Sequence, residues 1–249
     1  MDLQLDGRVA IVTGASRGLG RAIARALMDE GANVVAAARS HDELDELSAE
    51  RPNRLRAAVC DVTDEEAVAA LPGVALEAFG RLDIVVNNAG IAPAGPFLEQ
   101  PAEEWHRVLA VNVTAPAVLA RAAGAHLIRQ GAGKVINVAS TSGITGKPLL
   151  VSYSATKGAL VQLTKALAAE WASAGVQVNA IAPGAFETEA QRVVLESPEL
   201  HKRRVRKIPA GRIADPREIG PLACLLASPL SDYVTGAVFV IDGGEVSKL

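Results

Sequence analysis

Short apolar runs alternate with longer segments of helical periodicity along the chain. An apolar run of about four to eight residues that ends at turn residues is typical of a strand buried on both faces of a parallel sheet. Seven such runs are expected to form strands: residues 9–13, 33–38, 55–60, 82–86, 134–139, 176–181 and 238–241. Strands that alternate with helices predict a doubly wound parallel α/β sheet with right-handed crossovers and helices on both faces. We therefore expect a single domain over residues 1–249.

Sequence signals at the segment ends place the helices between these strands. Gly31 follows the first helical segment as a C-cap, and Thr63 opens a capping box with Glu66. Asp215 precedes Pro216, the usual order of an N-cap and the first helical position. Residues 189–208 are charged and only weakly periodic, so we expect a mobile helical lid there.

One helical pattern, from Pro101 toward Arg129, contains an internal proline. Pro116 cannot donate a backbone hydrogen bond to the carbonyl of Asn112, and its ring crowds that carbonyl. The helix should bend at this point, and the freed carbonyl could hold an ordered water. A simple kink without a function is the alternative.

Composition and charge exclude several classes of protein. The net charge is −3, which favours neither nucleic acid nor an anionic membrane as a partner. No apolar stretch approaches the length expected of a membrane span, and the N-terminus lacks the features of a signal peptide. Cys60 and Cys224 have no metal-ligand spacing, so we expect two buried thiols and no metal site. These features indicate a cytoplasmic protein.

A Gly-rich turn follows the first strand and opens the first helix. Glycine allows the backbone to approach a phosphate closely, and a helix N-terminus presents free N–H groups to it. The G-x-x-x-G-x-G spacing differs from the common G-x-G-x-x-G dinucleotide motif, and a tight turn without a ligand is the alternative. The cofactor-binding candidates in this turn are Gly14, Ser16, Arg17, Gly18, Leu19 and Gly20.

The end of the second strand indicates which dinucleotide would bind. A carboxylate that holds the ribose of NAD is expected there, but Ala38 is followed by Arg39 and Ser40. Arg39 suits the 2′-phosphate of NADP(H), and Arg17 can supply a second guanidinium. NADP(H) is therefore the preferred cofactor, with NAD(H) possible. Two solvated surface arginines are the alternative.

Polar or Gly-rich residues also follow other strands, at the sheet edge where open α/β folds bind ligands. Plain turns are the alternative. These segments contain Asp61 and Val62 after the third strand, Asn88, Ala89 and Gly90 after the fourth, Ser140 after the fifth, and Pro183, Gly184, Phe186 and Thr188 after the sixth.

Tyr153 stands thirteen residues after Ser140, and Lys157 follows Tyr153 by four residues. Positions i and i+4 share one face of a helix. A tyrosine has a pKa of about 10, and a positive charge at about 4 Å is worth on the order of 4 kcal/mol at a dielectric near 20. The ammonium would lower the tyrosine pKa by roughly 3, close to neutrality. Taken alone, the pair also suits an amphipathic helix with an exposed lysine.

Together these segments resemble the short-chain dehydrogenase/reductases over essentially the whole chain. The resemblance implies a Rossmann fold, NAD(P)-dependent oxidoreductase activity on CH–OH groups, and a homotetramer formed through the helices at 101–129 and 153–174. It rests on Thr13-Gly14-x-x-x-Gly18-x-Gly20, Asn87-Asn88-Ala89-Gly90, Asn112, Ser140, Tyr153-x-x-x-Lys157 and Pro183-Gly184.

The resemblance also implies a role for each site residue. Ser140 would bind the substrate oxygen, Tyr153 would transfer the proton, and Lys157 would hold the nicotinamide ribose and lower the tyrosine pKa. Asn112 would be the fourth catalytic residue and would hold a water that connects Lys157 to solvent. The remaining contacts would be Asp61 and Val62 to adenine, Asn88 to Gly90 around the adenosine ribose, and Ile181, Pro183 to Phe186 and Thr188 around the nicotinamide.

The substrate is the most open point. The chain resembles both sugar or polyol dehydrogenases, of the gluconate and xylulose types, and 3-oxoacyl-carrier-protein reductases. The latter often carry basic residues at positions that match Gly131 and Ala174 here, so this departure weakens that alternative, although Arg129 and Lys134 are close. A non-catalytic dinucleotide-sensing regulator is an alternative of another class, although its signature would be an incomplete set of catalytic residues.

The expected substrate pocket is lined by apolar and small polar side chains, with no cluster of anion-binding residues facing inward. The basic run 202–207 could meet an acidic partner or a phosphorylated substrate, but a solvated lid surface is the preferred interpretation. The expected lining comprises Ile91 to Gly95, Thr141, Ser142, Leu149, Leu150, Ala185, Phe186 and residues 189–208.

Overall fold

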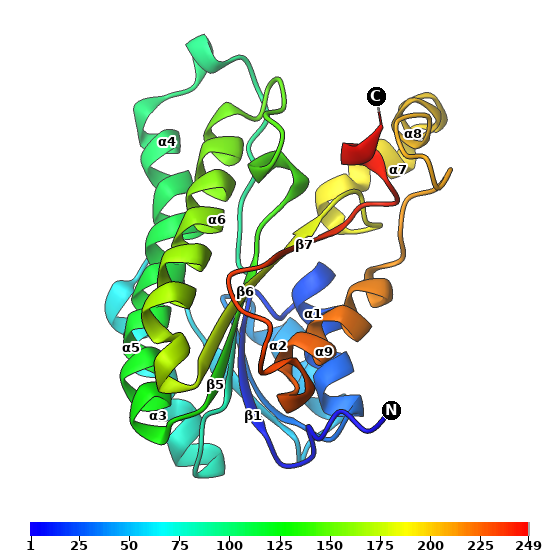
Figure 1. The fold of residues 1–249 in the computed structure, drawn as a ribbon. Helices are drawn as coiled ribbons and strands as arrows, with labels where there is room; N and C mark the ends of the chain where they lie inside the picture. The colour runs from blue at the N-terminus through cyan, green and yellow to red at the C-terminus, as the bar shows by residue number, and fades with distance from the viewer. Residues whose placement is uncertain (249) are drawn as a thin grey trace.

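The computed structural model describes residues 1–248 and contains one sheet of seven parallel strands (Figure 1). The strand boundaries lie within two residues of those predicted. The strands are β1 (Val9–Thr13), β2 (Asn33–Ala38), β3 (Leu55–Val59), β4 (Ile84–Asn87), β5 (Gly133–Val138), β6 (Val176–Pro183) and β7 (Val238–Ile241). Their order in the sheet is β3-β2-β1-β4-β5-β6-β7. The direction in which strands are added therefore reverses between β1 and β4, and this is the point where ligands bind in such sheets.

Helices cover both faces of the sheet (Figure 1). One face carries α1 (Gly18–Asp29), α2 (His41–Glu50) and α9 (Gly220–Ala227), and the other carries α3 (Glu65–Phe79), α5 (Ala115–Gln130) and α6 (Val151–Trp171). Along β1, Ala10 and Val12 join the core on the first face, whereas Val9 and Ile11 join the core on the second. Both sets of side chains are buried, which explains why this strand is apolar at every one of these positions.

A π-helical turn at Ala110–Thr114 separates α4 (Ala102–Leu109) from α5. The N–H of Ala115 donates to the carbonyl of Ala110, five residues earlier. Pro116 follows this turn and lacks the N–H that a regular helix would direct at Asn112. The predicted interruption at Asn112 is confirmed, and its form is a π turn, a feature frequent at functional sites.

The helical segment Ala102–Gln130 is long and apolar enough to span a membrane, contrary to the sequence expectation. Its most apolar window has a mean hydropathy of 1.5, but 56% of that window is buried inside the protein. Leu119, Ala123 and Leu127 of α5 belong to the core on one face of the sheet. The apolar composition therefore reflects a helix packed in the interior.

A side chain caps α3 as predicted, but the predicted capping residue, Thr63, is wrong. Asp64 is the N-cap, and its carboxylate accepts hydrogen bonds from the N–H groups of Glu66 and Ala67. Thr63 does not cap the helix because its N–H and hydroxyl both donate to Asp61, at 2.9 and 2.8 Å. The cap at Asp215 is confirmed and begins the short helix Pro216–Ile219.

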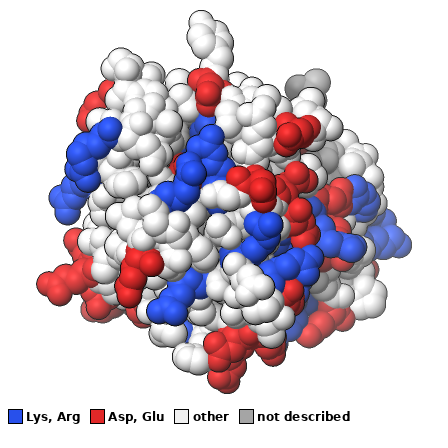
Figure 2. Space-filling view, turned by 90° about the horizontal axis from the view of Figure 1, so that it is seen from below, with Lys and Arg blue, Asp and Glu red and all other residues white. Residues whose placement is uncertain are grey.

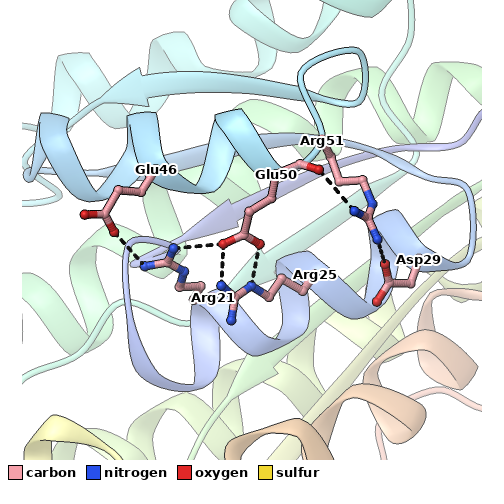
Figure 3. A network of polar contacts seen from close by, with 6 residues as sticks. All are labelled: Arg21, Arg25, Asp29, Glu46, Glu50 and Arg51. Carbon is pink, nitrogen blue, oxygen red and sulfur yellow. Dashed lines mark hydrogen bonds and ion pairs between the residues drawn. The ribbon is translucent and has the colours of Figure 1, made fainter.

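A group of ion pairs holds α2 against α1 (Figure 3). Glu50 at the end of α2 accepts hydrogen bonds from Arg21 and Arg25 of α1. These bonds, Arg25 first, lower the pKa of Glu50 to about 2. Further pairs at the two ends of this contact are Arg21 with Glu46 and Arg51 with Asp29. Because α2 directly follows the turn after β2, these pairs also help to fix that turn.

Charged side chains of both signs are interspersed on the face that Figure 2 draws. The short helix Glu245–Ser247 lies close to α7 (Arg192–Glu196) and α8 (Pro198–Val205), the helices of the segment predicted as a lid (Figure 1). Cys60 and Cys224 are buried and free, as predicted.

Candidate active site

A cavity of about 1070 Å³ lies at the carboxyl ends of the strands. It extends from the turns after β1 and β2, past the ends of β4 and β5, to the loop after β6 and the lid helices. Most residues predicted to bind a cofactor or to react line it, and those that do not are Gly20, Asn112, Ile181 and Ala185. The fold thus brings together residues as far apart in the sequence as Gly14 and Arg204.

The Gly-rich turn has the form of a phosphate cradle. Gly14 and Gly18 adopt φ angles of 64° and 56°, in the left-handed region that favours glycine. A Cβ atom at Gly20 would lie 2.2 Å from the Gly14 carbonyl oxygen, so this glycine allows helix α1 to pack closely on the turn. The first turn of α1 holds no acidic residue, and no side chain caps it. Its N–H groups therefore suit the pyrophosphate of a dinucleotide.

Asn88 holds this cradle in place. Its side-chain amide donates to the carbonyls of Thr13 and Gly14, at 2.9 and 3.2 Å. The hydroxyl of Thr13 accepts from the N–H groups of Asn88 and Ala89 in return. The end of β4 is thereby tied to the end of β1, and the Asn88 side chain serves the turn as well as the cavity wall.

The far end of the cavity combines one carboxylate with two arginines. Hydrogen bonds from Thr63 lower the pKa of Asp61, and the positive charge of Arg39 acts in the same direction. Arg17 and Arg39 both line the cavity, and neither forms an ion pair within residues 1–248. Ser40 lines the cavity beside them. Two guanidinium groups without a carboxylate partner suit a 2′-phosphate.

Ser140, Tyr153 and Lys157 meet at the centre of the cavity. Ser140 caps the short helix Thr141–Gly143, where its hydroxyl accepts from the N–H of Ser142. It also shares a hydrogen bond with the Tyr153 side chain. Lys157 is buried on the same helix face as Tyr153, and its ammonium donates to the Val138 carbonyl at 2.7 Å.

The predicted effect of Lys157 on Tyr153 is not found in the chain by itself. Burial raises the pKa of Tyr153, and the hydrogen bond with Ser140 opposes that rise. Burial also lowers the pKa of Lys157 to about 8. The ammonium lies 5.7 Å from the centre of the tyrosine ring and is directed to the Val138 carbonyl. The two groups are thus farther apart than the about 4 Å expected from helix geometry, and burial disfavours the charged form of both.

Asn112 lies behind this centre and outside the cavity lining. Its side chain is fully buried, accepts from the N–H of Ile91, and donates to the Ile91 carbonyl and the Thr156 hydroxyl. A Cβ atom at Gly90 would be 3.4 Å from the side-chain oxygen of Asn112 and 3.5 Å from Lys157 Nζ. Asn112 therefore ties the segment after β4 to α6 close to Lys157. Its role in holding a water stays a prediction.

Gly143 is a site residue that the sequence did not reveal. A Cβ atom there would lie 2.6 Å from both the carbonyl carbon and the carbonyl oxygen of Lys157. The turn that begins at Ser140 thus rests directly on the backbone of α6. Only the spacing between Ser140 and Gly143 could have indicated this contact, and serine and glycine at such a spacing are common in turns of every kind.

The substrate side of the cavity contradicts the prediction that no cluster of anion-binding residues faces inward. Ile91, Thr141, Ser142, Leu150 and Phe186 line it as expected. His106, Arg107, Lys147 and Arg204 line it as well. Arg204 comes from the basic run 202–207 that was expected to face solvent. Lys147 could have been predicted from the sequence, because it lies in the same loop as Thr141, Ser142 and Leu150, which were expected to line the pocket.

A sequence model of the family described as "Enoyl-(Acyl carrier protein) reductase" matches residues 14–245. The galactitol 2-dehydrogenase (L-tagatose-forming) of Cereibacter sphaeroides is 44% identical over 244 residues, which cover 97% of this chain and 96% of that protein. The gluconate 5-dehydrogenase of Gluconobacter oxydans is 38% identical over 250 residues, covering 98% and 97%.

Solved structures show the same architecture. The gluconate 5-dehydrogenase from Burkholderia cenocepacia, in complex with NADP and tartrate, superimposes with a TM-score of 0.94 at 35% identity, covering 100% of this chain and 98% of that one. A putative NAD(P)-dependent gluconate 5-dehydrogenase from Beutenbergia cavernae with bound NADP gives 0.93 at 38% identity, covering both chains completely.

Proposed function

Because this chain belongs to the short-chain dehydrogenase/reductase family, we propose that it is an NADP(H)-dependent oxidoreductase of sugar- or polyol-type substrates. It would interconvert a secondary alcohol and a ketone. The relatives described above are named as polyol and gluconate dehydrogenases, and solved relatives contain NADP. These names support the substrate class and the cofactor proposed here.

One observation carries this proposal. A single cavity joins the phosphate cradle and the two unpaired arginines to the group of Ser140, Tyr153 and Lys157. A dinucleotide bound along it would have its phosphates at Gly14 to Gly20 and its 2′-phosphate at Arg17 and Arg39. When bound, its nicotinamide supplies or accepts the hydride.

The chain's own residues would handle the proton and the substrate oxygen. The Ser140 hydroxyl would donate a hydrogen bond to that oxygen and hold it beside the Tyr153 hydroxyl. In reduction Tyr153 would give its proton to the oxygen, and in oxidation it would take that proton as a base. Lys157, set close to Asn112, would lower the tyrosine pKa once its ammonium turns toward the ribose side of the site.

Substitution of Tyr153 by Phe tests this function. The variant should lose turnover because the proton donor is gone, while NADPH binding, followed by its fluorescence, stays nearly unchanged. Wild-type protein should oxidise NADPH with ketoses and should show a higher kcat/KM with NADPH than with NADH. A Tyr153→Phe variant that kept more than a few per cent of activity would contradict the assigned role.

The structure gives little support to a carrier-protein reductase. The side chain of Lys134 is buried and its ammonium is 2.6 Å from the Asp232 carboxylate, so it is not available to an acidic carrier. Gly131 and Ala174, the positions where basic residues are expected in such reductases, cannot supply charge. A dinucleotide sensor would bind NADPH tightly without turning over any substrate in the same assay.

We also propose that the protein is a soluble homotetramer of the cytoplasm. Small residues on α6, such as Ala155 and Ala159, lie exposed on this helix and permit close packing with another helix. A monomer in light scattering of the purified protein would contradict this assembly.

A further inference from the structure

Three charged side chains from distant parts of the chain meet at the substrate end of the cavity. Lys147 lies in the loop before α6, Arg204 lies on α8, and Glu245 lies just after β7. Arg204 donates to both carboxylate oxygens of Glu245, at 2.8 and 2.7 Å. Lys147 Nζ is 3.7 Å from the same carboxylate. Two cations thus share the one carboxylate within ion-pair distance of them, which leaves one positive charge without an ion-pair partner among residues 1–248.

The unpaired charge belongs mainly to Lys147. The Arg204 guanidinium and the Glu245 carboxylate form a bidentate pair that uses both oxygens. The Lys147 ammonium lies beyond ordinary hydrogen-bond distance of that carboxylate and donates instead to the Thr141 hydroxyl, at 2.9 Å. An ammonium has three N–H donors, so it keeps donors for a ligand in the cavity that it lines.

Lys147 is held in a fixed position beside the reaction centre. Its backbone N–H donates to the Ser154 hydroxyl on α6, and its side chain reaches Thr141, the residue next to Ser140. Burial lowers the pKa of Lys147, whereas the charge of Glu245 raises it. An anionic group on the substrate would stabilise the charged ammonium in the same manner as Glu245 does.

The charge of Asp242 also raises the pKa of Lys147, but the Asp242 carboxylate oxygens accept hydrogen bonds from the N–H groups of Gly244 and Val246. Arg107 of α4 lines the same cavity as a further cation. Glu189, the acidic side chain in the lining on this side, is paired with Arg192 at 3.2 Å. The substrate end therefore carries a positive excess beside an ordered ammonium donor.

We infer that Lys147 binds a carboxylate at the end of the substrate, so that the preferred substrates are polyhydroxy acids rather than neutral polyols. This inference rests on the proposed function. In the reaction, the secondary alcohol of the acid would lose a hydride to NADP⁺ and its hydroxyl proton to Tyr153, which leaves a ketone and NADPH. The carboxylate would remain unchanged, bound to Lys147, with Arg204 held beside it by Glu245.

Matched pairs of substrates test this selectivity. D-gluconate and D-glucitol differ only in a carboxylate against a CH₂OH group, as do D-galactonate and galactitol. Reduction of NADP⁺ is measured with each, for wild type, for Lys147→Met, and for the control Lys202→Met, which removes an exposed cation on α8. The readout is the ratio of kcat/KM for the acid to that for its neutral partner.

Wild type should favour the acid in at least one pair. Lys147→Met should lower the ratio about 10- to 100-fold, through KM for the acid, since it removes a charge-assisted hydrogen bond. Lys202→Met should leave the ratio unchanged. If Lys147→Met does not fold, Lys147→Gln retains a donor for Thr141 without the charge and should lower the ratio in the same direction.

The possible results distinguish a failure of this inference from a failure of the proposed function. Turnover of neutral polyols with an unchanged ratio in Lys147→Met, or in Lys147→Gln, overturns the inference and leaves the proposed function intact. If none of the four compounds reduces NADP⁺, the proposed function for sugar- and polyol-type substrates is overturned, and this inference with it.

Discussion

The contact between Gly143 and the backbone of Lys157 offers a sharp test of how the active site is assembled. In Gly143→Ala, the new methyl group would lie 2.6 Å from the carbonyl carbon and oxygen of Lys157, where ordinary contact begins at 3.4 Å. The methyl group would therefore be about 0.8 Å too close to the Lys157 carbonyl group. Both sides of the contact are backbone, so the turn that begins at Ser140 has to move away from α6.

A displacement of about 1 Å at reacting groups is expected to cost on the order of 100-fold in rate. Overpacking costs about 1–3 kcal/mol of stability. We therefore expect kcat for ketose reduction to fall by on the order of 100-fold, with a moderate fall in melting temperature. The dissociation constant for NADPH should change little, because the phosphate cradle is built by β1, α1 and β4.

Two alanine substitutions nearby serve as controls. A Cβ atom at Gly146, in the same loop, meets nothing within 4 Å, and one at Gly158 meets only the Gly143 carbonyl oxygen at 3.8 Å. Both should retain activity. If Gly143→Ala keeps a kcat similar to that of Gly146→Ala, or if it loses NADPH binding to the same extent as turnover, the inferred local displacement is wrong.

Three further predictions concern charged side chains. Because burial depresses the pKa of Lys157 to about 8 from 10.5, unfolding takes up protons between these values. The free energy of unfolding of wild type, relative to that of Lys157→Met, should then rise across that pH window by on the order of 3 kcal/mol, as measured by urea titration. A difference between the two proteins that does not change with pH would contradict the buried charge. The pKa of Glu50 is lowered to about 2 from 4.5. At pH 7, wild type should therefore be more stable than Glu50→Gln, by on the order of 1 kcal/mol because the ion pair is partly exposed. This difference in the free energy of unfolding should vanish as the pH falls from 4.5 toward 2. Arg39→Ala should raise KM for NADPH about 10- to 100-fold and leave KM for NADH unchanged; an equal effect on both cofactors would argue against a 2′-phosphate contact.

The strands could be predicted from sequence because most are buried on both faces. Val9 to Thr13 are apolar at nearly every position for that reason, and β2 and β4 are similar, whereas β5 and β6 are equally buried but include polar residues such as Asn137 and Asn179. The interruption at Asn112 could be predicted as well, because Pro116 acts through covalent structure alone. Local chemistry thus determined the elements and the position of the interruption.

Side-chain directions could not be predicted in the same way. Asp64 rather than Thr63 caps α3 because the Thr63 hydroxyl donates to Asp61, a contact that spacing does not decide. The pKa of Tyr153 depended on burial and on the direction of the Lys157 ammonium. Arg204 could turn inward because Glu245, 41 residues later, is placed beside it by β7. These outcomes depend on tertiary contacts between segments distant in the chain.

The strand order has a consequence for how the protein is made. As the chain leaves the ribosome, every new strand finds its neighbour already synthesised: β2 pairs with β1, β3 with β2, β4 with the free side of β1, and β5 to β7 follow outward. The sheet can therefore grow during translation without waiting for later residues.

Glu245 emerges only after β7, so the carboxylate that orients Arg204 is synthesised after every strand of the sheet. A nascent chain that has reached residue 244 contains every strand and the complete dinucleotide cradle, while the substrate end still lacks its anion. The contact between Arg204 and Glu245 is thus completed only after all seven strands have been synthesised.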